Sequence, residues 1–239
     1  MVARFGWVAA LAIALAAVTA RAETATVAVA TNFAQPLKAL APAFTAATGH
    51  AIAIAAASTG QLYAQIRQGA PFDVFLAADA GRPAALVEDG VAIAASRFAY
   101  AYGRLVLLSR SPAATGKDCL DVLRAASRIA IANPAIAPYG RAARQTLEAL
   151  GLWHQVEARI VQGQDVGQTY AFIATANAEA GFVALSQVIA DPAQVIADPA
   201  GPGCRWDVDP ELHAPLEQQA VLLAHGAANA AALAFLDFL

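Results

Sequence analysis

Short apolar runs alternate with segments of helical periodicity in the first third of the chain. Apolar runs of strand length occur at residues 26–30, 51–57 and 72–76. Helical stripes lie between them at residues 37–44, followed by Gly49 as a stop signal, and at residues 62–68. Pro42 lies inside the first stripe, so we expect a kink there. The resulting order of strands and helices is typical of a parallel sheet covered by helices.

A helix is predicted at residues 80–88. The pattern then changes at residues 98–103, FAYAYG, and a second unit with the same alternation of strands and helices follows. Its predicted strands are 104–109, 128–132, 159–161 and 181–185, and its predicted helices are 141–150 and 169–179. The simplest boundary between the units is near Tyr102, and a late strand at 220–223 with an Ala-rich terminal helix is placed to return to the first unit. The heptapeptide at 187–193 recurs at 194–200, and because both copies contain Pro, a surface loop is predicted.

The first 22 residues have the layout of a secretory signal. Arg4 precedes an apolar stretch at residues 5–18, and small residues lead to a predicted cleavage after Ala22. The alternative is a transmembrane anchor, but the apolar stretch is shorter than the ~20 residues that span a bilayer. We therefore expect an exported protein that starts at Glu23.

Composition narrows the function classes. The chain is 59% hydrophobic and 14% charged, with a mean hydropathy of +0.51 that owes much to Ala. Without residues 1–22 it has 13 basic and 18 acidic residues, a net charge of −5. No run of Lys or Arg occurs, which excludes phosphate-backbone recognition of nucleic acids and electrostatic binding to a membrane surface.

Two cysteines, Cys119 and Cys204, would lie in an oxidising compartment after export. A disulfide between them is therefore expected, closing a loop of roughly 85 residues. The alternative is two unpaired buried thiols. No C-x-x-C motif or cluster of Cys and His occurs, so we predict neither a zinc site nor a redox motif.

Four segments share one design, in which a strand ends, a few small or hydrogen-bonding residues follow, and a helix begins. They lie at residues 30–33, 57–60, 138–140 and 164–167. In open α/β sheets, ligands bind at the carboxyl ends of strands, where helix N-termini present free N–H groups and positive dipole ends. Such a site favours an anion.

Ordinary N-capping explains any one of these segments taken alone, but two in each unit can line a cleft from both sides. None of the four contains Arg or Lys, so the predicted cage consists of uncharged N–H and O–H donors. Lys38 and Arg141 fall inside predicted helices, which leaves Arg141 as a charge outside the cage.

Enzyme signatures are weak. No G-x-S-x-G nucleophile elbow occurs, and the four histidines are scattered, so we interpret them as surface residues. Asp73 and Asp79 flank an apolar strand as a catalytic pair would, but they lack a partnering His. Turn and capping roles are predicted for both.

The chain resembles the periplasmic molybdate-binding proteins of the ModA type, the substrate-binding components of ABC importers. The resemblance runs from about Thr24 to the C-terminus. It is carried by VAVATNF at 27–33, ASTG at 57–60, YAQI at 63–66, GAPFDVFLAAD at 69–79, SRF at 96–98 with Tyr100, and GFVALSQ at 181–187.

This resemblance implies a type II periplasmic-binding-protein fold, with two α/β lobes, a two-segment hinge and a ligand cleft between them. The implied division is 1–22 as signal peptide, 23–102 as the first lobe, 103–213 as the second lobe and 214–239 as the return to the first. Hinge motion is expected near Tyr102 and through residues 204–213. The implied oxyanion ligands are Thr31, Asn32, Ser58, Thr59, Tyr139 and the backbone N–H of Val166.

Some positions depart from the family pattern. Asn32, Tyr139 and Ala184 stand where some relatives have Ser, Ala and Tyr, so the resemblance implies that Tyr139 supplies the hydroxyl and that Ala184 is not a ligand. Thr59 replaces the more usual Ser.

The function implied is that of a monomeric receptor that binds molybdate or tungstate as an oxyanion and delivers it to an inner-membrane molybdate ABC permease. No cofactor and no direct metal-cation ligand are expected. Two alternatives stay open: a receptor for another oxyanion such as sulfate or phosphate, and an exported enzyme on the same lobes.

Overall fold

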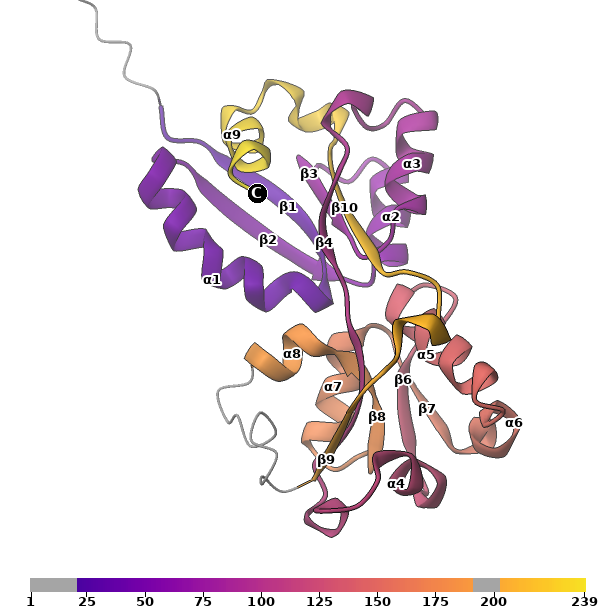
Figure 1. Cartoon of the computed structure of the whole chain (residues 1–239). Helices are drawn as coiled ribbons and strands as arrows, with labels where there is room; N and C mark the ends of the chain where they lie inside the picture. The colour runs from indigo at the N-terminus through magenta and orange to yellow at the C-terminus, as the bar shows by residue number, and fades with distance from the viewer. Residues whose placement is uncertain (1–20, 191–202) are drawn as a thin grey trace, which may run out of the picture.

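The computed structural model describes residues 21–190 and 203–239, which form two lobes, each built around a five-stranded sheet (Figure 1). The first sheet has the strand order β2 (Ala51–Ala57), β1 (Thr24–Ala30), β3 (Val74–Ala77), β10 (Glu217–Leu222), β4 (Phe98–Tyr102). The second has the order β7 (Ile160–Gly163), β6 (Ile129–Ala132), β8 (Ala180–Ala184), β5 (Leu105–Ser109), β9 (Cys204–Asp207).

Three neighbouring strands in each sheet are parallel, as the alternation along the chain predicts. Strand β1 pairs in parallel with β2 and β3, and β6 pairs in parallel with β7 and β8. Strands β10 and β5 are the antiparallel neighbours of β3 and β8. The parallel strands therefore direct their carboxyl ends to one edge of each sheet.

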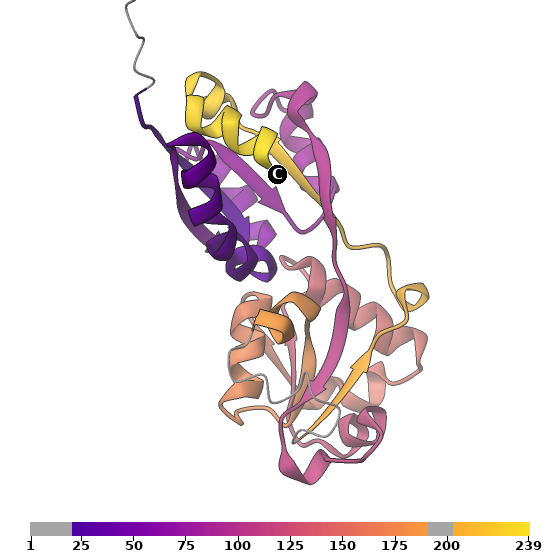
Figure 2. The same ribbon diagram turned by 60° about the vertical axis from the view of Figure 1, so that its left-hand side comes forward.

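Helices cover the sheets on both faces (Figure 2). Those of the first lobe are α1 (Thr31–Thr48), α2 (Thr59–Arg67), α3 (Gly81–Glu88) and α9 (Ala230–Phe238). Those of the second are α4 (Cys119–Ala125), α5 (Pro138–Ala149), α6 (Trp153–Val156), α7 (Val166–Ala174) and α8 (Leu185–Ala190). Five short 3₁₀ turns complete the described elements: η1 (Ala94–Ser96), η2 (Pro112–Ala114), η3 (Glu157–Arg159), η4 (Pro210–Leu212) and η5 (Ala224–Ala228).

Strand β1 shows why the first sheet has helices on both faces. Val27 and Val29 belong to one buried cluster with Phe44 of α1 and Phe235 of α9. Ala28, between them, belongs to a second cluster on the other face, with Leu62 of α2 and Leu86 of α3. Side chains alternate between the faces of a strand, so a strand buried on both faces is an uninterrupted apolar run.

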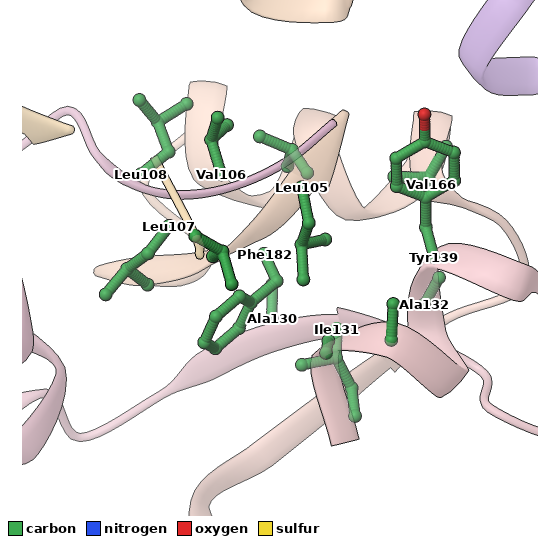
Figure 3. Close-up of a cluster of buried hydrophobic side chains, with 14 of the residues drawn as sticks. Leu105, Val106, Leu107, Leu108, Ala130, Ile131, Ala132, Tyr139, Val166 and Phe182 are labelled. Atoms are coloured by element: carbon green, nitrogen blue, oxygen red, sulfur yellow. The ribbon is translucent and has the colours of Figure 1, made fainter. Parts of the chain in front are cut away.

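The second lobe has one large buried cluster around β5, β6 and β8 (Figure 3). Leu105, Leu107, Ile131 and Phe182 are fully buried in it. Figure 3 also shows the ring of Tyr139 beside Val166, with its hydroxyl oxygen pointing away from Ile131. Tyr139 and Val166 thus lie at the side of this core that faces the first lobe.

The chain crosses between the lobes twice. The first crossing joins β4 to β5 after Tyr102, and the second joins β9 to β10 through η4 (Figure 1). Strand β10 then pairs with β3 and β4, so the segment after residue 216 completes the first sheet.

Several helices begin earlier than their apolar stripes predict. Helices α2, α5 and α7 each start three residues before the predicted positions 62, 141 and 169. Their first turns contain polar, Gly and Pro residues that carry no apolar periodicity. Helix α7 also ends at Ala174 instead of 179, and Ala176 has the left-handed φ of 58°. The third strand likewise begins at Val74 and not at residue 72.

The predicted disulfide between Cys119 and Cys204 is confirmed, with an S–S distance of 2.03 Å. It joins α4 to the start of β9, so both ends of the link lie within the second lobe. The predicted signal peptide, apart from residues 21 and 22, and residues 191–200 of the duplicated heptapeptide lie outside the described residues. The prediction of a surface loop was wrong for residues 187–190, which belong to α8 (Leu185–Ala190), where Val188 is buried. In the parts of the chain that are described, no helix has the length and apolar character needed to cross a membrane.

Candidate functional site

A small cavity lies where the two lobes face each other. Its lining comes from four strand-to-helix junctions, two in each lobe, and from Ala78 after β3. The lining includes the six residues predicted as ligands. The lining residues are Ala30, Thr31, Asn32, Ser58, Thr59, Ala78, Ala137, Pro138, Tyr139, Asp165 and Val166. The cavity volume is about 10 Å³, room for roughly one water molecule. A ligand larger than a water molecule therefore requires the junctions to move slightly apart from this closed arrangement.

Helix α1 starts at the cavity without a side-chain cap. Ala30 occupies the N-cap position and offers no side-chain acceptor, so the N–H groups of the first turn have no partner from the cap. Thr31 and Asn32 are the first two residues of this helix, and Asn32 is 2% exposed. An acceptor located in the cavity would accept hydrogen bonds from these N–H groups of α1.

Helix α5 repeats the arrangement in the second lobe. Its N-cap is Ala137, again without a side-chain hydrogen bond, and Pro138 at the first position lacks an N–H. Tyr139 follows and is 3% exposed. Two uncapped helix N-termini from opposite lobes therefore meet at one cavity, and their dipoles both favour an anion there.

The other two helix starts are capped by side chains. Ser58 Oγ accepts from the Gln61 N–H at 3.3 Å and the Ser58 N–H donates to Gln61 Oε1 at 3.2 Å, which forms a capping box for α2. The Ser58 hydroxyl also donates to Gln61 Oε1 at 2.9 Å. The predicted ligand Ser58 therefore has an ordinary capping role as well. Asp165 caps α7 by accepting from the Gln168 N–H at 2.9 Å, which leaves the N–H of Val166, the first residue of α7, without a partner from that cap.

Thr59 contributes a hydroxyl whose acceptor side is already occupied. Its Oγ1 accepts from the Ala78 N–H at 3.1 Å, and the residue is 1% exposed. Since that oxygen already accepts, its proton is available to a further acceptor. The Ala78 N–H, after β3, thus holds the Thr59 hydroxyl in place as a donor.

No Arg or Lys lines the cavity among the described residues. The nearby Arg141 and Arg82 both pair with Asp79, and the Arg141 Nη2 to Asp79 Oδ2 distance is 3.3 Å. Arg141 lies on α5 and Asp79 follows β3, so this pair links the two lobes beside the cavity. The prediction that Arg141 is a charge outside the cage agrees with this position.

Asp73 has a structural role, but not the turn or capping role predicted for it, and it does have a His partner. It is 4% exposed, and its Oδ2 accepts from the Thr26 N–H at 2.7 Å and from Asn229 at 3.2 Å. Its Oδ1 lies 3.0 Å from His225 Nδ1. Asp79 Oδ1 accepts from the Arg82 N–H at 3.0 Å, which agrees with its predicted turn role.

The Tyr139 hydroxyl is held in its protonated form. Burial raises the pKa of Tyr139 far above the usual range of a tyrosine, and hydrogen bonds from Asn32 and Gln218 offset only part of this shift. Burial also raises the pKa of Tyr100, with the neighbouring Tyr139 as a second cause. Near neutral pH, the cage therefore keeps a neutral hydroxyl that is able to donate.

Close contacts between the lobes define the closed arrangement. The Gly60 N–H donates to the Ile136 carbonyl at 2.8 Å. An added Cβ on Gly60 would lie 2.8 Å from the same oxygen, so only glycine allows this approach.

Sequence reasoning missed one further link between the lobes. Pro36 lacks the N–H that would normally bond the Asn32 carbonyl within α1. That carbonyl instead accepts from the Ser186 hydroxyl of α8 at 2.7 Å. Pro36, four residues after a predicted ligand, was the available signal for a free carbonyl there.

Three other observations bear on chemistry. Tyr100 and Gln218, both missed in the sequence, hydrogen bond at 3.0 Å behind the cavity. Ala184 is fully buried in β8 and does not line the cavity. No group of three His, Cys, Asp or Glu side chains that could hold a metal ion occurs within residues 21–190 and 203–239.

Comparison with known proteins places the chain among solute receptors. The family model for bacterial extracellular solute-binding proteins matches residues 25–239. Molybdate-binding protein ModA of Rhodobacter capsulatus is 45% identical over 212 residues, which cover 89% of this chain and 81% of the relative. The protein of the same name from Azotobacter vinelandii is 44% identical over 97% of this chain and 90% of its own length.

A solved structure agrees with these relatives. The Azotobacter vinelandii periplasmic molybdate-binding protein superposes with a TM-score of 0.80 at 41% identity, covering 90% of this chain and 91% of the other.

Proposed function

Because this chain belongs to the bacterial extracellular solute-binding proteins, and within them to the ModA family, we propose that it is a periplasmic receptor for molybdate and tungstate. It binds the oxyanion between its lobes and delivers it to an inner-membrane ABC permease. In this proposal the lobes are residues 23–102 with 214–239, and residues 103–213, and the hinge is formed by the two crossing segments.

The observation that carries the proposal is the meeting of two uncapped helix N-termini at a cavity without a basic side chain. Helices α1 and α5 each lack a side-chain acceptor at the N-cap, and they approach the cavity from opposite lobes. Hydrogen bonds to a charged acceptor contribute roughly 1.5 to 3 kcal/mol each. Several such donors are sufficient to hold a dianion without a cationic side chain.

The proposed ligands are the six residues predicted from the sequence, in different roles. The N–H groups of the first turns of α1 and α7 are backbone donors, at Thr31, Asn32 and Val166, while α5 contributes its positive dipole end and the Tyr139 hydroxyl. The hydroxyls of Thr59 and Tyr139 are side-chain donors, and that of Ser58 becomes one if its proton turns away from Gln61.

A receptor role agrees with the comparisons, since both relatives at 44–45% identity are named as binding proteins and not as enzymes. The disulfide supports export to the periplasm, because such bonds persist in oxidising compartments. The signal-peptide layout of residues 1–22 supports the same location.

The test is a calorimetric titration of the purified chain, from Glu23 onward, with molybdate, tungstate, sulfate and phosphate. We expect molybdate and tungstate to bind in a one-to-one ratio, far more tightly than the other two anions. Sulfate or phosphate binding as tight as molybdate binding would favour the receptor for another oxyanion. Absence of binding by all four anions would overturn the proposal.

A further inference from the structure

Gln218 lies directly behind the cavity and does not line it. It is located on β10, the strand with which the chain returns to the first sheet, and it is 4% exposed. A buried primary amide has to satisfy two N–H donors and one carbonyl acceptor. The partners of Gln218 are therefore informative about the groups that it faces.

The side-chain oxygen of Gln218 faces two donors. Its Oε1 accepts from Asn32 Nδ2 at 2.8 Å and from the Tyr100 hydroxyl at 3.0 Å. A flipped amide would set its NH₂ group against the NH₂ group of Asn32, so the Asn32 donor fixes the orientation. The Nε2 atom consequently points to the other side, where it donates to the Tyr139 hydroxyl oxygen at 3.5 Å.

Both side-chain neighbours of the Tyr139 oxygen are donors. Gln218 donates through Nε2 at 3.5 Å, and the Asn32 amide, which donates to Gln218 Oε1 at 2.8 Å, lines the same cavity as Tyr139. An amide NH₂ group cannot accept the tyrosine proton. The single O–H proton of Tyr139 therefore has to point away from Gln218. Tyr139 lines the small cavity between the junctions, and a second cavity of about 210 Å³ lies on the side of Gln218 and Gly103, so the small cavity is where an acceptor for this proton would be located away from Gln218.

The hydrogen-bond network around Gln218 joins the two lobes next to the first crossing segment. Tyr139 comes from the second lobe, whereas Asn32, Tyr100 and Gln218 come from the first. Gly103, between β4 and β5, packs closely against the Tyr139 hydroxyl and the Gln218 amide. An added Cβ on Gly103 would overlap the Tyr139 hydroxyl and lie 2.9 Å from Gln218 Nε2. The contacts to Tyr139 thus form in the closed arrangement.

We propose that Gln218 is a positioning residue that makes Tyr139 a hydrogen-bond donor to the bound oxyanion. Gln218 does not contact the ligand; it occupies the acceptor side of the tyrosine oxygen and thereby directs the proton into the cavity. The inference rests on the proposed function, and it adds a residue outside the cage that determines how one cage group behaves.

The experiment is a double-mutant cycle read by calorimetric titration with molybdate. The variants are Gln218→Met, Tyr139→Phe and the double substitution, and the matched control is Gln219→Met. Gln219 is the adjacent residue of the same strand, and its Nε2 donates to Glu217 Oε1. Circular dichroism and a thermal melt of each unliganded variant report on folding.

We expect Gln218→Met to weaken molybdate binding about ten- to a hundredfold, the range for one donor to a charged acceptor. In the Tyr139→Phe background the same change should cost at least about fivefold less, because the hydroxyl through which Gln218 acts is absent. Gln219→Met should bind within about twofold of the wild-type chain.

Gln218→Glu is a second variant of nearly the same size, which keeps the test valid if the Met variant does not fold. An ionised Glu offers only acceptors, so the Tyr139 proton would turn toward it, and we expect a loss at least as large as that of Gln218→Met. Wild-type affinity of either variant, or an equal loss in both backgrounds, overturns the inference while wild-type binding preserves the proposed function. Absence of molybdate binding by the wild-type chain would overturn both.

Discussion

Replacement of Tyr139 by Phe removes one oxygen from the cage and leaves the ring in place. The side chain is 3% exposed and its ring packs beside Val166 (Figure 3), so the substitution preserves the packing of the second lobe. The free energy of molybdate binding should become less favourable by about 1.5 to 3 kcal/mol, the contribution of a neutral donor to a charged acceptor. At 1.36 kcal/mol per factor of ten, this corresponds to a roughly 10- to 150-fold weaker affinity.

Isothermal titration calorimetry at pH 7.5 measures this change directly. Lys38→Ala is the matched control, since Lys38 is exposed on α1 and does not line the cavity. The Lys38→Ala variant should bind molybdate with the affinity of the wild-type chain. The melting temperature of the unliganded Phe variant should fall by only a few degrees, because the substitution removes one long hydrogen bond, from Gln218 Nε2 at 3.5 Å. An affinity of the Phe variant within twofold of wild type would refute the placement of Tyr139 in the cage.

Three further predictions concern lobe contact, the disulfide and pH. Gly60→Ala should weaken molybdate binding by about 1 to 3 kcal/mol, because the new Cβ would lie 2.8 Å from the Ile136 carbonyl oxygen and hold the lobes apart. Calorimetric titration measures this change, and unchanged affinity would contradict the closed arrangement. Cys119→Ser should lower the free energy of unfolding in urea by up to about 4 to 5 kcal/mol and leave molybdate affinity unchanged, because Cys204 lies in the same lobe; a large loss of affinity would place the link at the hinge. Molybdate affinity should stay constant between about pH 7 and 9, because burial raises the pKa of Tyr139 and the hydroxyl therefore keeps its proton beyond the usual range; a decline through that interval would mean that the hydroxyl ionises.

The strand-to-helix junctions were predictable because each is a local signal. A run such as VAVATNF contains the end of a buried strand and the polar start of a helix within seven residues. The expectation that four such junctions come together needed only the rule that parallel strands end at one sheet edge. The structure brings the six predicted residues to one cavity accordingly.

Contacts between distant segments were not predictable in this way. Gln218 lies 186 positions from Asn32, and nothing in the local pattern of β10 distinguishes it from Gln219. The capping role of Ser58 was equally ambiguous, because a Ser before a helix caps it in the same position from which it would contact a ligand. The helix starts were predicted too late for a different reason, since their first turns contain polar, Gly and Pro residues that carry no apolar periodicity.

The central claim is that uncharged donors at helix N-termini of both lobes hold the oxyanion. A crystal structure of the chain with bound molybdate tests this claim most directly. The account predicts anion oxygens within hydrogen-bond distance of backbone N–H groups of α1 and α7 and of the Tyr139 and Thr59 hydroxyls, with Arg141 still paired to Asp79. An Arg or Lys side chain in contact with the anion, or molybdate bound outside this cavity, would contradict it.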